Sequence, residues 1–223
     1  MKIAIIGYGK MGHAIEALAK GRGHEVVCTV DNPEQWLSNE PLLRSADVAV
    51  EFSTPATAVQ NIRRCWQLGL PVVCGTTGWD VQRKEIEDEC VASGRTLLAA
   101  SNFSIGMNIM FALNERLAEL MAGRDEYRAS ITETHHIHKL DAPSGTALVL
   151  KSQIGRPGVE ITSVRKGEVP GIHTVIYDSP IDTISITHEA HSREGLAQGA
   201  LLAAEFLSKA KPGVYSMKDI LNG

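Results

Sequence analysis

The stretch Lys2–Gly12, with the sequence KIAIIGYGKMG, decides the fold that we expect for this chain. The apolar run Lys2–Ile6 predicts a short buried strand, the glycines after it predict a tight turn, and Met11–Lys20 has apolar residues at helical spacing. The run Glu25–Val30 is rich in β-branched residues and predicts a second strand. A strand, a crossover helix and a strand form the unit from which parallel sheets are built.

The alternation of strands and helices continues as far as residue 104. Apolar runs predict further strands, and helical spacing predicts helices between them: strands Asp47–Phe52, Pro71–Cys74 and Thr96–Ala99, and helices Thr57–Leu68 and Val81–Ala92. We therefore predict the α/β class, with a Rossmann-type doubly wound parallel sheet.

The pattern changes after Asn102. A long amphipathic helix, Met107–Met121, precedes a series of strand candidates: Tyr127–His136, Ile161–Arg165, Thr174–Tyr177 and Thr183–His188. A last helix, Glu194–Ser208, is expected to pack back onto the first domain. We predict that residues 1–104 and 194–223 form a dinucleotide-binding domain and that residues 105–193 form a second, smaller α+β domain.

Composition excludes several classes of partner. The formal net charge of −4 leaves no basic surplus of the kind that duplex nucleic acid or an anionic membrane requires. The longest uncharged stretch, Thr96–Asn114, carries too many asparagine and serine residues for a membrane span. The four cysteines have no CxxC spacing, so we expect reduced thiols and a cytoplasmic location.

The glycine motif predicts dinucleotide binding through Gly7-Tyr8-Gly9-Lys10-Met11-Gly12. Its first glycine permits the tight turn, its second permits approach of a pyrophosphate, and its third permits close packing of helix on sheet. Asp31, at the end of the second strand, is placed to accept hydrogen bonds from a ribose diol and to repel a 2′-phosphate. NADH is therefore expected to be preferred, with NADPH as a possible second cofactor. The alternative is that Asp31 only opens a turn with Asn32-Pro33.

Two further loops follow predicted strands at the edge where ligands bind in such sheets. Gly75-Thr76-Thr77-Gly78 follows one strand, and Ala100-Ser101-Asn102-Phe103 follows the next. Each is also compatible with an ordinary turn. Their shared position makes Gly75, Thr76, Thr77 and Ala100–Phe103 candidate cofactor-binding residues.

The polar segment THHIHKLDAPSGTA, Thr134–Ala147, is the other informative stretch. A metal site is the weaker interpretation, because His135 and His136 would point to opposite faces of a strand and no paired carboxylate or cysteine has ligand spacing. The stronger interpretation is acid–base chemistry followed by an anion-binding helix N-terminus. That helix could equally be capped by Asp141 or Ser144 beside a solvated loop.

The pattern EXHHXXKXDAPSGTA (Glu133–Ala147), after a GxGxMG start, resembles the dihydrodipicolinate reductase family. The resemblance includes GTTG (Gly75–Gly78), SNFSIGMN (Ser101–Asn108) and ITHEAHSREGLAQGA (Ile186–Ala200). It implies reduction of 4-hydroxy-tetrahydrodipicolinate, a small cyclic dicarboxylate, with NAD(P)H in lysine and diaminopimelate synthesis. It also implies a homotetramer held together through the second domain.

The same resemblance implies roles for single residues. His135 matches the family's proton donor or acceptor, and Lys139 matches its second proton donor. Substrate binding is implied for His136, Ser144, Gly145 and Thr146.

Two departures from the family pattern concern the cofactor: the glycine loop is one residue shorter, and asparagine instead of arginine follows Asp31. The alternatives are another Rossmann-type dehydrogenase with a different second domain, and a regulator that binds NADH without turnover.

Overall fold

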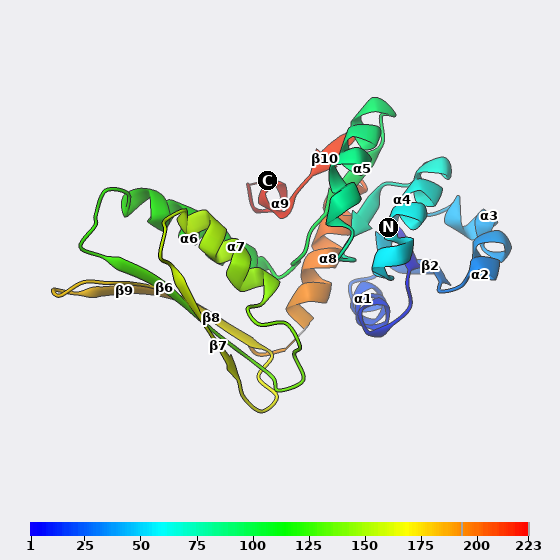
Figure 1. Cartoon of the computed structure of the whole chain (residues 1–223). Helices are drawn as coiled ribbons and strands as arrows, with labels where there is room; N and C mark the ends of the chain where they lie inside the picture. Colours follow the sequence, from blue (N-terminus) through cyan, green and yellow to red (C-terminus); the bar gives the residue numbers. More distant parts are fainter. Residues whose placement is uncertain (193, 223) are drawn as a thin grey trace. The chain divides into compact units, whose positions relative to one another are not determined.

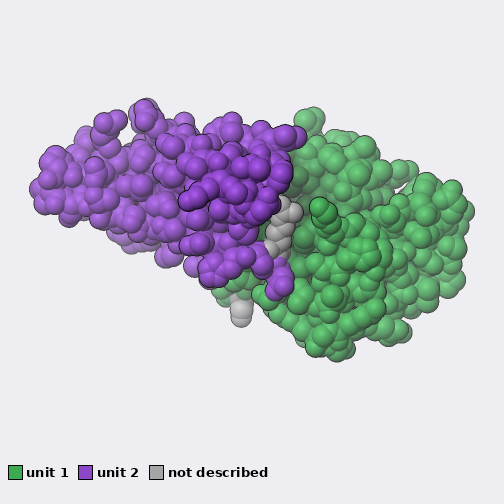
Figure 2. Space-filling model, turned by 90° about the horizontal axis from the view of Figure 1, so that it is seen from below, with its two compact units in different colours: residues 1–105, 196–223 green, residues 106–195 purple. Residues whose placement is uncertain are grey.

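The computed structural model describes residues 1–192 and 194–222. Arg193 and Gly223, at which the two predicted domain segments end, lie outside the described residues. The chain divides into two compact units, one made of Met1–Ile105 with Leu196–Gly223 (unit 1) and the other of Gly106–Gly195 (unit 2). Figure 2 colours the two units separately.

Unit 1 contains a six-stranded sheet in the order β10-β5-β4-β3-β1-β2, in which every pair is parallel. Its strands are β1 (Lys2–Ile6), β2 (Glu25–Val30), β3 (Val48–Glu51), β4 (Val72–Cys74), β5 (Thr96–Ala99) and β10 (Gly213–Tyr215). All residues of β3, β4 and β5 are buried, as expected for strands covered on both faces.

Helices cover both faces of this sheet (Figure 1). The helices of unit 1 are α1 (Lys10–Gly21), α2 (Pro33–Ser38), α3 (Glu40–Leu43), α4 (Pro55–Gln67), α5 (Asp80–Ala92), α8 (Glu194–Leu207) and α9 (Met217–Asn222). One core cluster joins α4 and α5 to residues such as Ala4 and Val72, and the other joins α1 and α8 to residues such as Ile5 and Val50. Alternate strand residues therefore serve opposite faces.

Unit 2 contains a four-stranded mixed sheet in the order β7-β6-β8-β9. Its elements are α6 (Ile105–Leu120), β6 (Arg128–His135), α7 (Gly145–Ile154), β7 (Glu160–Arg165), β8 (Gly171–Asp178) and β9 (Thr183–Ala190). Both helices lie over one face of the sheet (Figure 1), where Met110 and Leu150 pack against Ile131 and Val175. Neither helix covers the opposite face, to which Thr132 and its cross-strand partner Thr174 point.

The predicted fold class is confirmed, and the differences concern short elements. The alternative interpretation of Asp31 placed a turn at Asn32-Pro33, but Asn32 caps a helix there, because its side chain accepts a hydrogen bond from Gln35 N at 3.0 Å and Pro33 fits the first helical position. The sequence analysis also did not predict α3, β10 or α9, which have few residues each. In the ranges that the structure describes, no helix combines the length and the apolar character needed to cross a membrane.

Candidate functional site

The carboxyl ends of the parallel strands of unit 1 share one edge, and most of the predicted cofactor residues lie on it. Gly7 follows β1, Asp31 follows β2, Gly75 follows β4 and Ala100 follows β5. Backbone hydrogen bonds join neighbouring strand ends, for example from Gly7 N to Val30 O at 2.7 Å. The strand order reverses direction at β1, and such a switch point is where open α/β sheets bind ligands.

The glycines of the turn between β1 and α1 serve different purposes. Gly7 has a φ of +88°, and a Cβ there would lie 2.2 Å from the carbonyl oxygen of Phe52. A Cβ on Gly12 would lie 2.6 Å from the carbonyl oxygen of Gly7. Both glycines are therefore required by packing. Gly9 caps α1 without a side-chain hydrogen bond, and a Cβ there would meet no described atom within 4 Å. The space before the helix N-terminus is open to a ligand.

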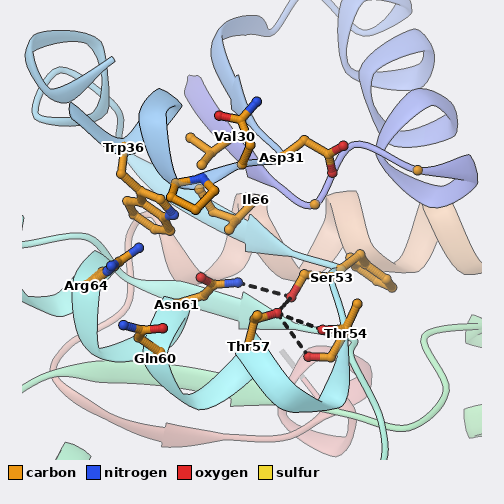
Figure 3. Close-up of a pocket in the computed structure, with 15 residues that line it drawn as sticks. Ile6, Val30, Asp31, Trp36, Ser53, Thr54, Thr57, Gln60, Asn61 and Arg64 are labelled. Carbon is orange, nitrogen blue, oxygen red and sulfur yellow. Dashed lines mark hydrogen bonds between the residues drawn. The ribbon is translucent and has the colours of Figure 1, made fainter. Parts of the chain in front are cut away.

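A pocket of about 420 Å³ lies at this edge (Figure 3). Of the predicted cofactor residues, it is lined by Gly7, Gly9 and Asp31. It is also lined by Trp36, Ser53, Thr57, Gln60, Asn61 and Arg64. The other predicted residues lie outside the lining of this pocket: Tyr8, Lys10, Met11, Gly12, Gly75, Thr76, Thr77, Ala100, Ser101, Asn102 and Phe103. The structure therefore brings three of the predicted cofactor residues together in one cavity and adds others.

Asp31 holds the glycine turn in place. Its Oδ1 accepts a hydrogen bond from Tyr8 N at 2.9 Å, and its own amide donates to Gln35 Oε1 at 2.6 Å. The side chain is exposed, and among the described residues its Oδ2 accepts no hydrogen bond. Asp31 therefore keeps one oxygen available for a ribose hydroxyl.

Arg64 was missed by the sequence analysis, which considered only the immediate neighbours of Asp31 when it looked for a cation. The guanidinium carbon lies 5.3 Å from the centroid of the Trp36 ring, and both side chains line the pocket (Figure 3). Arg64 comes from α4, 33 positions after Asp31 in the chain (64 − 31). Only the fold brings the two residues to one pocket.

The loops after β3 and β4 fix the position of Ser53, which lines the pocket, through hydrogen bonds. Ser53 N donates to Thr76 Oγ1 at 2.8 Å, and Asn61 Nδ2 donates to Ser53 Oγ at 3.0 Å. Glu51, which is fully buried, accepts hydrogen bonds from Ser53 Oγ and from Cys74 Sγ, the latter at 3.2 Å. Thr76 therefore acts on the pocket through Ser53.

The two remaining cofactor candidates with a clear packing role are Gly75 and Phe103. A Cβ on Gly75 would lie 2.1 Å from the Phe52 ring, so glycine is needed there. Phe103 is only 2% exposed, and its ring centroid lies 5.7 Å from that of Phe52. In this structure both residues contribute to packing behind the pocket.

In unit 2, strand β6 places Glu133 and His135 on the same face, because side chains alternate along a strand. Glu133 is fully buried and His135 is 8% exposed. The distance between His135 Nδ1 and Glu133 Oε2 is 3.0 Å. The other oxygen, Oε1, accepts hydrogen bonds from Ser144 N and from Arg165 Nη2, both at 3.1 Å.

His173 on β8 completes this buried cluster. Its Nε2 lies 3.3 Å from Ser144 Oγ and 3.9 Å from Glu133 Oε2. The rings of His135 and His173 meet edge to face, with centroids 5.0 Å apart. Glu133, Arg165 and His173 were absent from the predicted site. Glu133 stands only two positions before His135 and was visible as an EXH pattern, whereas Arg165 and His173 required the strand register.

Burial and charge set the protonation of this cluster. Burial lowers the pKa of His135, and the opposing effect of the Glu133 carboxylate is reduced by Lys139 and Arg165, which act in the same direction as burial. Burial and the neighbouring His135 lower the pKa of His173 to about 4. Burial alone would raise the pKa of Glu133, but hydrogen bonds from Ser144, Ser163 and Arg165 outweigh it and lower the pKa to about 2. At neutral pH the cluster therefore holds one carboxylate, one guanidinium and two neutral imidazoles.

Glu133, His135 and His173 are also close enough together to surround a metal ion, with ligand atoms all within 4.8 Å. The surroundings do not favour a cation. Arg165 places a positive charge 3.1 Å from Glu133 Oε1, and the Ser144 amide occupies the same oxygen. We therefore interpret the cluster as a hydrogen-bonded ionic network.

The loop after β6 contains the remaining predicted residues. Lys139 Nζ forms an ion pair with Asp141 Oδ1 at 2.7 Å. The ring of His136, which is half-buried, lies 5.9 Å from that of His138, and His138 pairs with Glu168 at the surface. Lys139 is therefore neutralised by its own loop.

Helix α7 begins directly after this loop. Ser144 caps it by accepting a hydrogen bond from Ala147 N at 3.2 Å, so Ser144, and not Asp141, is the cap. A Cβ on Gly145 would meet no described atom within 4 Å, and Thr146 is half-buried beside it. Nothing in the packing requires glycine at position 145, and the space before it is free for a ligand.

Two family models account for almost the whole chain. "Dihydrodipicolinate reductase, N-terminus" matches residues 1–103, and "Dihydrodipicolinate reductase, C-terminus" matches residues 106–221. The chain belongs to the dihydrodipicolinate reductase family. It is therefore an NAD(P)H-dependent reductase of lysine and diaminopimelate biosynthesis.

Relatives in this family extend over the full length. The 4-hydroxy-tetrahydrodipicolinate reductase of Christiangramia forsetii is 42% identical over 100% of this chain and 98% of its own. That of Alkaliphilus oremlandii is 35% identical over 100% of this chain and 99% of its own. Both relatives are thus similar in both halves, which argues against a dehydrogenase that shares only the first domain.

Solved structures agree in fold. A dipicolinate-bound dihydrodipicolinate reductase from Paenisporosarcina sp. TG-14 has a TM-score of 0.76 at 22% identity, over 97% of each chain. An amine dehydrogenase from Mycobacterium smegmatis has a TM-score of 0.65 at 11% identity, over 97% of this chain and 95% of its own. At these identities the likeness concerns the fold alone.

The residues of unit 1 fit the nicotinamide cofactor that the family uses. The open space before Gly9, the free oxygen of Asp31 and the aromatic face of Trp36 suit, in turn, a pyrophosphate, a ribose and a purine ring.

Proposed function

We propose that this chain performs the family's reaction, the NAD(P)H-dependent reduction of 4-hydroxy-tetrahydrodipicolinate to tetrahydrodipicolinate, with the cofactor held by unit 1 and the substrate by unit 2. The observation that carries the proposal is in unit 2: a buried imidazole, a lysine and an open helix N-terminus gather in one polar segment. Such a set suits a substrate with two carboxylates that must gain a proton.

His135 is proposed to exchange that proton. When bound, the cofactor would supply the hydride, and the negative charge that then develops on the substrate requires an acid close by. Burial lowers the pKa of His135, so the imidazole is neutral in the free protein at pH 7. A dianionic substrate beside it would stabilise the imidazolium and raise its pKa, so that the acid becomes charged only when substrate is present.

Lys139 is proposed to stabilise negative charge on the substrate and to act as the second proton donor. Its ammonium pairs with Asp141 in the free protein, and a substrate carboxylate would compete for it. The amides of Gly145 and Thr146, together with His136 and Ser144, are proposed to bind a carboxylate at the N-terminus of α7. The open space at Gly145 supports this assignment.

For the cofactor we propose a preference for NADH, since the exposed carboxylate of Asp31 would repel a 2′-phosphate. Arg64 in the same pocket reduces that repulsion and makes NADPH a usable second cofactor. Tyr8, Lys10 and Met11 are proposed to act through the glycine turn, and Thr76, Thr77 and Ala100–Asn102 through the neighbouring edge of the sheet.

We also propose a cytoplasmic homotetramer with no nucleic-acid or membrane partner. The sheet face of unit 2 that neither α6 nor α7 covers supports assembly through this unit. The four cysteines are buried free thiols, which suits a reducing compartment.

The proposed function is tested by supplying freshly generated 4-hydroxy-tetrahydrodipicolinate and following the absorbance of NADH and, in parallel, of NADPH. His135→Ala is expected to lower kcat by about 10² to 10⁴-fold, the usual contribution of a positioned acid, with little change in the KM for the cofactor. His138→Ala is the matched control, since His138 is exposed and paired with Glu168. Wild-type protein without turnover, or His135→Ala with normal turnover, would contradict the proposal.

A further inference from the structure

The carboxylate of Glu133 has an unusual set of partners for a fully buried group. Oε1 accepts hydrogen bonds from Arg165 Nη2 and from the backbone amide of Ser144, while Oε2 lies 3.0 Å from His135 Nδ1. Both Oε2 and Nδ1 are buried and neither makes a well-aligned hydrogen bond to any described group, so each is left to pair with the other. One carboxylate thus contacts the proposed proton donor and the cap residue of the helix that is proposed to bind substrate. Any movement of Glu133 would disturb both.

The two nitrogens of His135 face different surroundings. Nδ1 lies beside Glu133, which, as a carboxylate, can only accept a proton. Nε2 lies beside Gly171 on the neighbouring strand, where a Cβ would come within 3.2 Å of it. Since Gly171 carries no side chain, this residue places no competing side-chain group beside Nε2. The neutral ring should therefore carry its hydrogen on Nδ1 and expose a lone pair at Nε2.

Charge around the ring is balanced. The groups that act on His135 are Glu133 on β6, Lys139 and Asp141 in the following loop, Arg165 on β7 and His173 on β8, with His188 on β9 acting on His173. Burial is the largest influence and lowers the pKa of His135, whereas the carboxylate 3.0 Å away raises it. Lys139 and Arg165 oppose that carboxylate, and Arg165 lies 3.1 Å from it.

We propose that Glu133 is a positioning residue for the reaction: its carboxylate, neutralised by Arg165, holds His135 by Nδ1 so that Nε2 exchanges the proton with the substrate. The inference rests on the proposed function, because it assigns the reacting nitrogen of the proposed acid. It goes beyond that function because the two partners of the Glu133–Arg165 ion pair are assigned opposite effects on the pKa of His135. Glu133 raises the proton affinity of the imidazole, and Arg165 lowers it.

The test is ¹⁵N NMR of the histidine rings in the free protein, which requires no substrate or turnover. Wild-type His135 is expected to be the Nδ1–H tautomer. Glu133→Gln is expected to shift the tautomer toward Nε2–H and to lower the pKa of His135, whereas Arg165→Met is expected to raise that pKa. Glu168→Gln is the matched control, because it removes the carboxylate of the exposed pair with His138 and should leave His135 unchanged.

Kinetics supply a second readout. The alkaline limb of log kcat/KM against pH is expected to shift to lower pH in Glu133→Gln and to higher pH in Arg165→Met. Glu133→Asp is expected to recover most of the wild-type pH profile. A purely structural role for Glu133 would lower thermal stability without moving the tautomer or the limb. If Glu133→Gln does not fold, Arg165→Met and Glu133→Asp still provide the test.

The proposal is overturned by an Nε2–H tautomer in wild type, or by variants of Glu133 and Arg165 that leave the pKa of His135 where it was. Failure of the proposed function looks different: wild-type protein would show no turnover while the NMR results stand.

Discussion

His173 lies in the interior of unit 2 with 5% of its surface exposed, and burial together with His135 lowers its pKa to about 4. In the unfolded chain the same group titrates near 6.5. The unfolded state therefore binds the additional proton first as the pH falls. The stability associated with neutral His173 is fully present above pH 6.5 and is lost as the pH falls through 4.

The first prediction follows from this window. The free energy of unfolding, measured by urea titration, should fall by up to about 3 kcal/mol between pH 6.5 and 4, because a pKa difference of about 2.5 corresponds to roughly that amount. His173→Gln should show a shallower slope over the same interval. Glu133, with its pKa lowered to about 2, adds a separate loss below pH 4.5. An unchanged slope in His173→Gln would show that other groups cause the acid sensitivity.

The second prediction concerns cofactor choice. Asp31→Asn can still accept the hydrogen bond from Tyr8 N but has no charge, so kcat/KM for NADPH should rise about tenfold relative to NADH, equivalent to about 1.4 kcal/mol. Arg64→Gln should act in the opposite direction and weaken NADPH more than NADH. Arg63→Gln, one position away on α4 but paired with Glu85 and Glu89, is the control. If Arg64→Gln affects kcat/KM for the two cofactors equally, Arg64 does not take part in recognising the 2′-phosphate.

At the scale of the elements, the turn from β1 to α1 contains two kinds of glycine. Packing requires glycine at positions 7 and 12 but not at position 9. The third prediction compares Gly7→Ala with Gly9→Ala. Gly7→Ala places a Cβ 2.2 Å from a backbone oxygen at a positive φ and should lower Tm strongly or prevent folding. Gly9→Ala should cost at most about 1 kcal/mol, as for other helix caps, yet weaken NADH binding measured by calorimetry. Full NADH affinity in Gly9→Ala would place the pyrophosphate elsewhere.

The sequence predicted those elements whose pattern is local. Apolar runs such as Lys2–Ile6 and Thr96–Ala99 identify buried parallel strands directly, because both faces of such strands are covered. Strand β10 has only three residues and depends on pairing with β5 for its existence, so no local pattern indicates it. Helices α2 and α3 have only six and four residues, too short for a periodic apolar pattern to indicate them.

The candidate site shows the same division. His135 and Lys139 stand in one motif and could be named from the sequence, whereas Arg165 reaches Glu133 only because β7 pairs in parallel with β6, with His135 opposite Arg165. Burial is the main cause of the lowered pKa of His135, and Arg165, placed by that pairing, acts in the same direction. No spacing rule in the sequence contains such information.

For the molecule as a whole, the uncovered sheet face of unit 2 predicts self-association. Ile176 lies on this face, partly exposed and outside the core cluster that packs against α6 and α7. The fourth prediction is that Ile176→Lys lowers the molar mass measured by light scattering from that of the proposed tetramer toward smaller species. Ile181→Lys, in the exposed turn after β8, should leave the mass unchanged. A monomeric wild-type protein would contradict the proposed tetramer directly.

Unit 1 is built from two separate pieces of chain, and the later piece supplies α8 and the edge strand β10. A ribosome therefore releases the whole of unit 2 before it releases the segment that covers Ile5, Val50 and Leu98. Until then apolar residues on one face of the nascent sheet remain exposed to solvent and prone to aggregation. Unit 2 is a continuous segment, so all of its residues are available for folding by that time. Newly made protein should therefore need protection from chaperones late in synthesis, and a stop codon after residue 195 should yield insoluble chains instead of a smaller working enzyme.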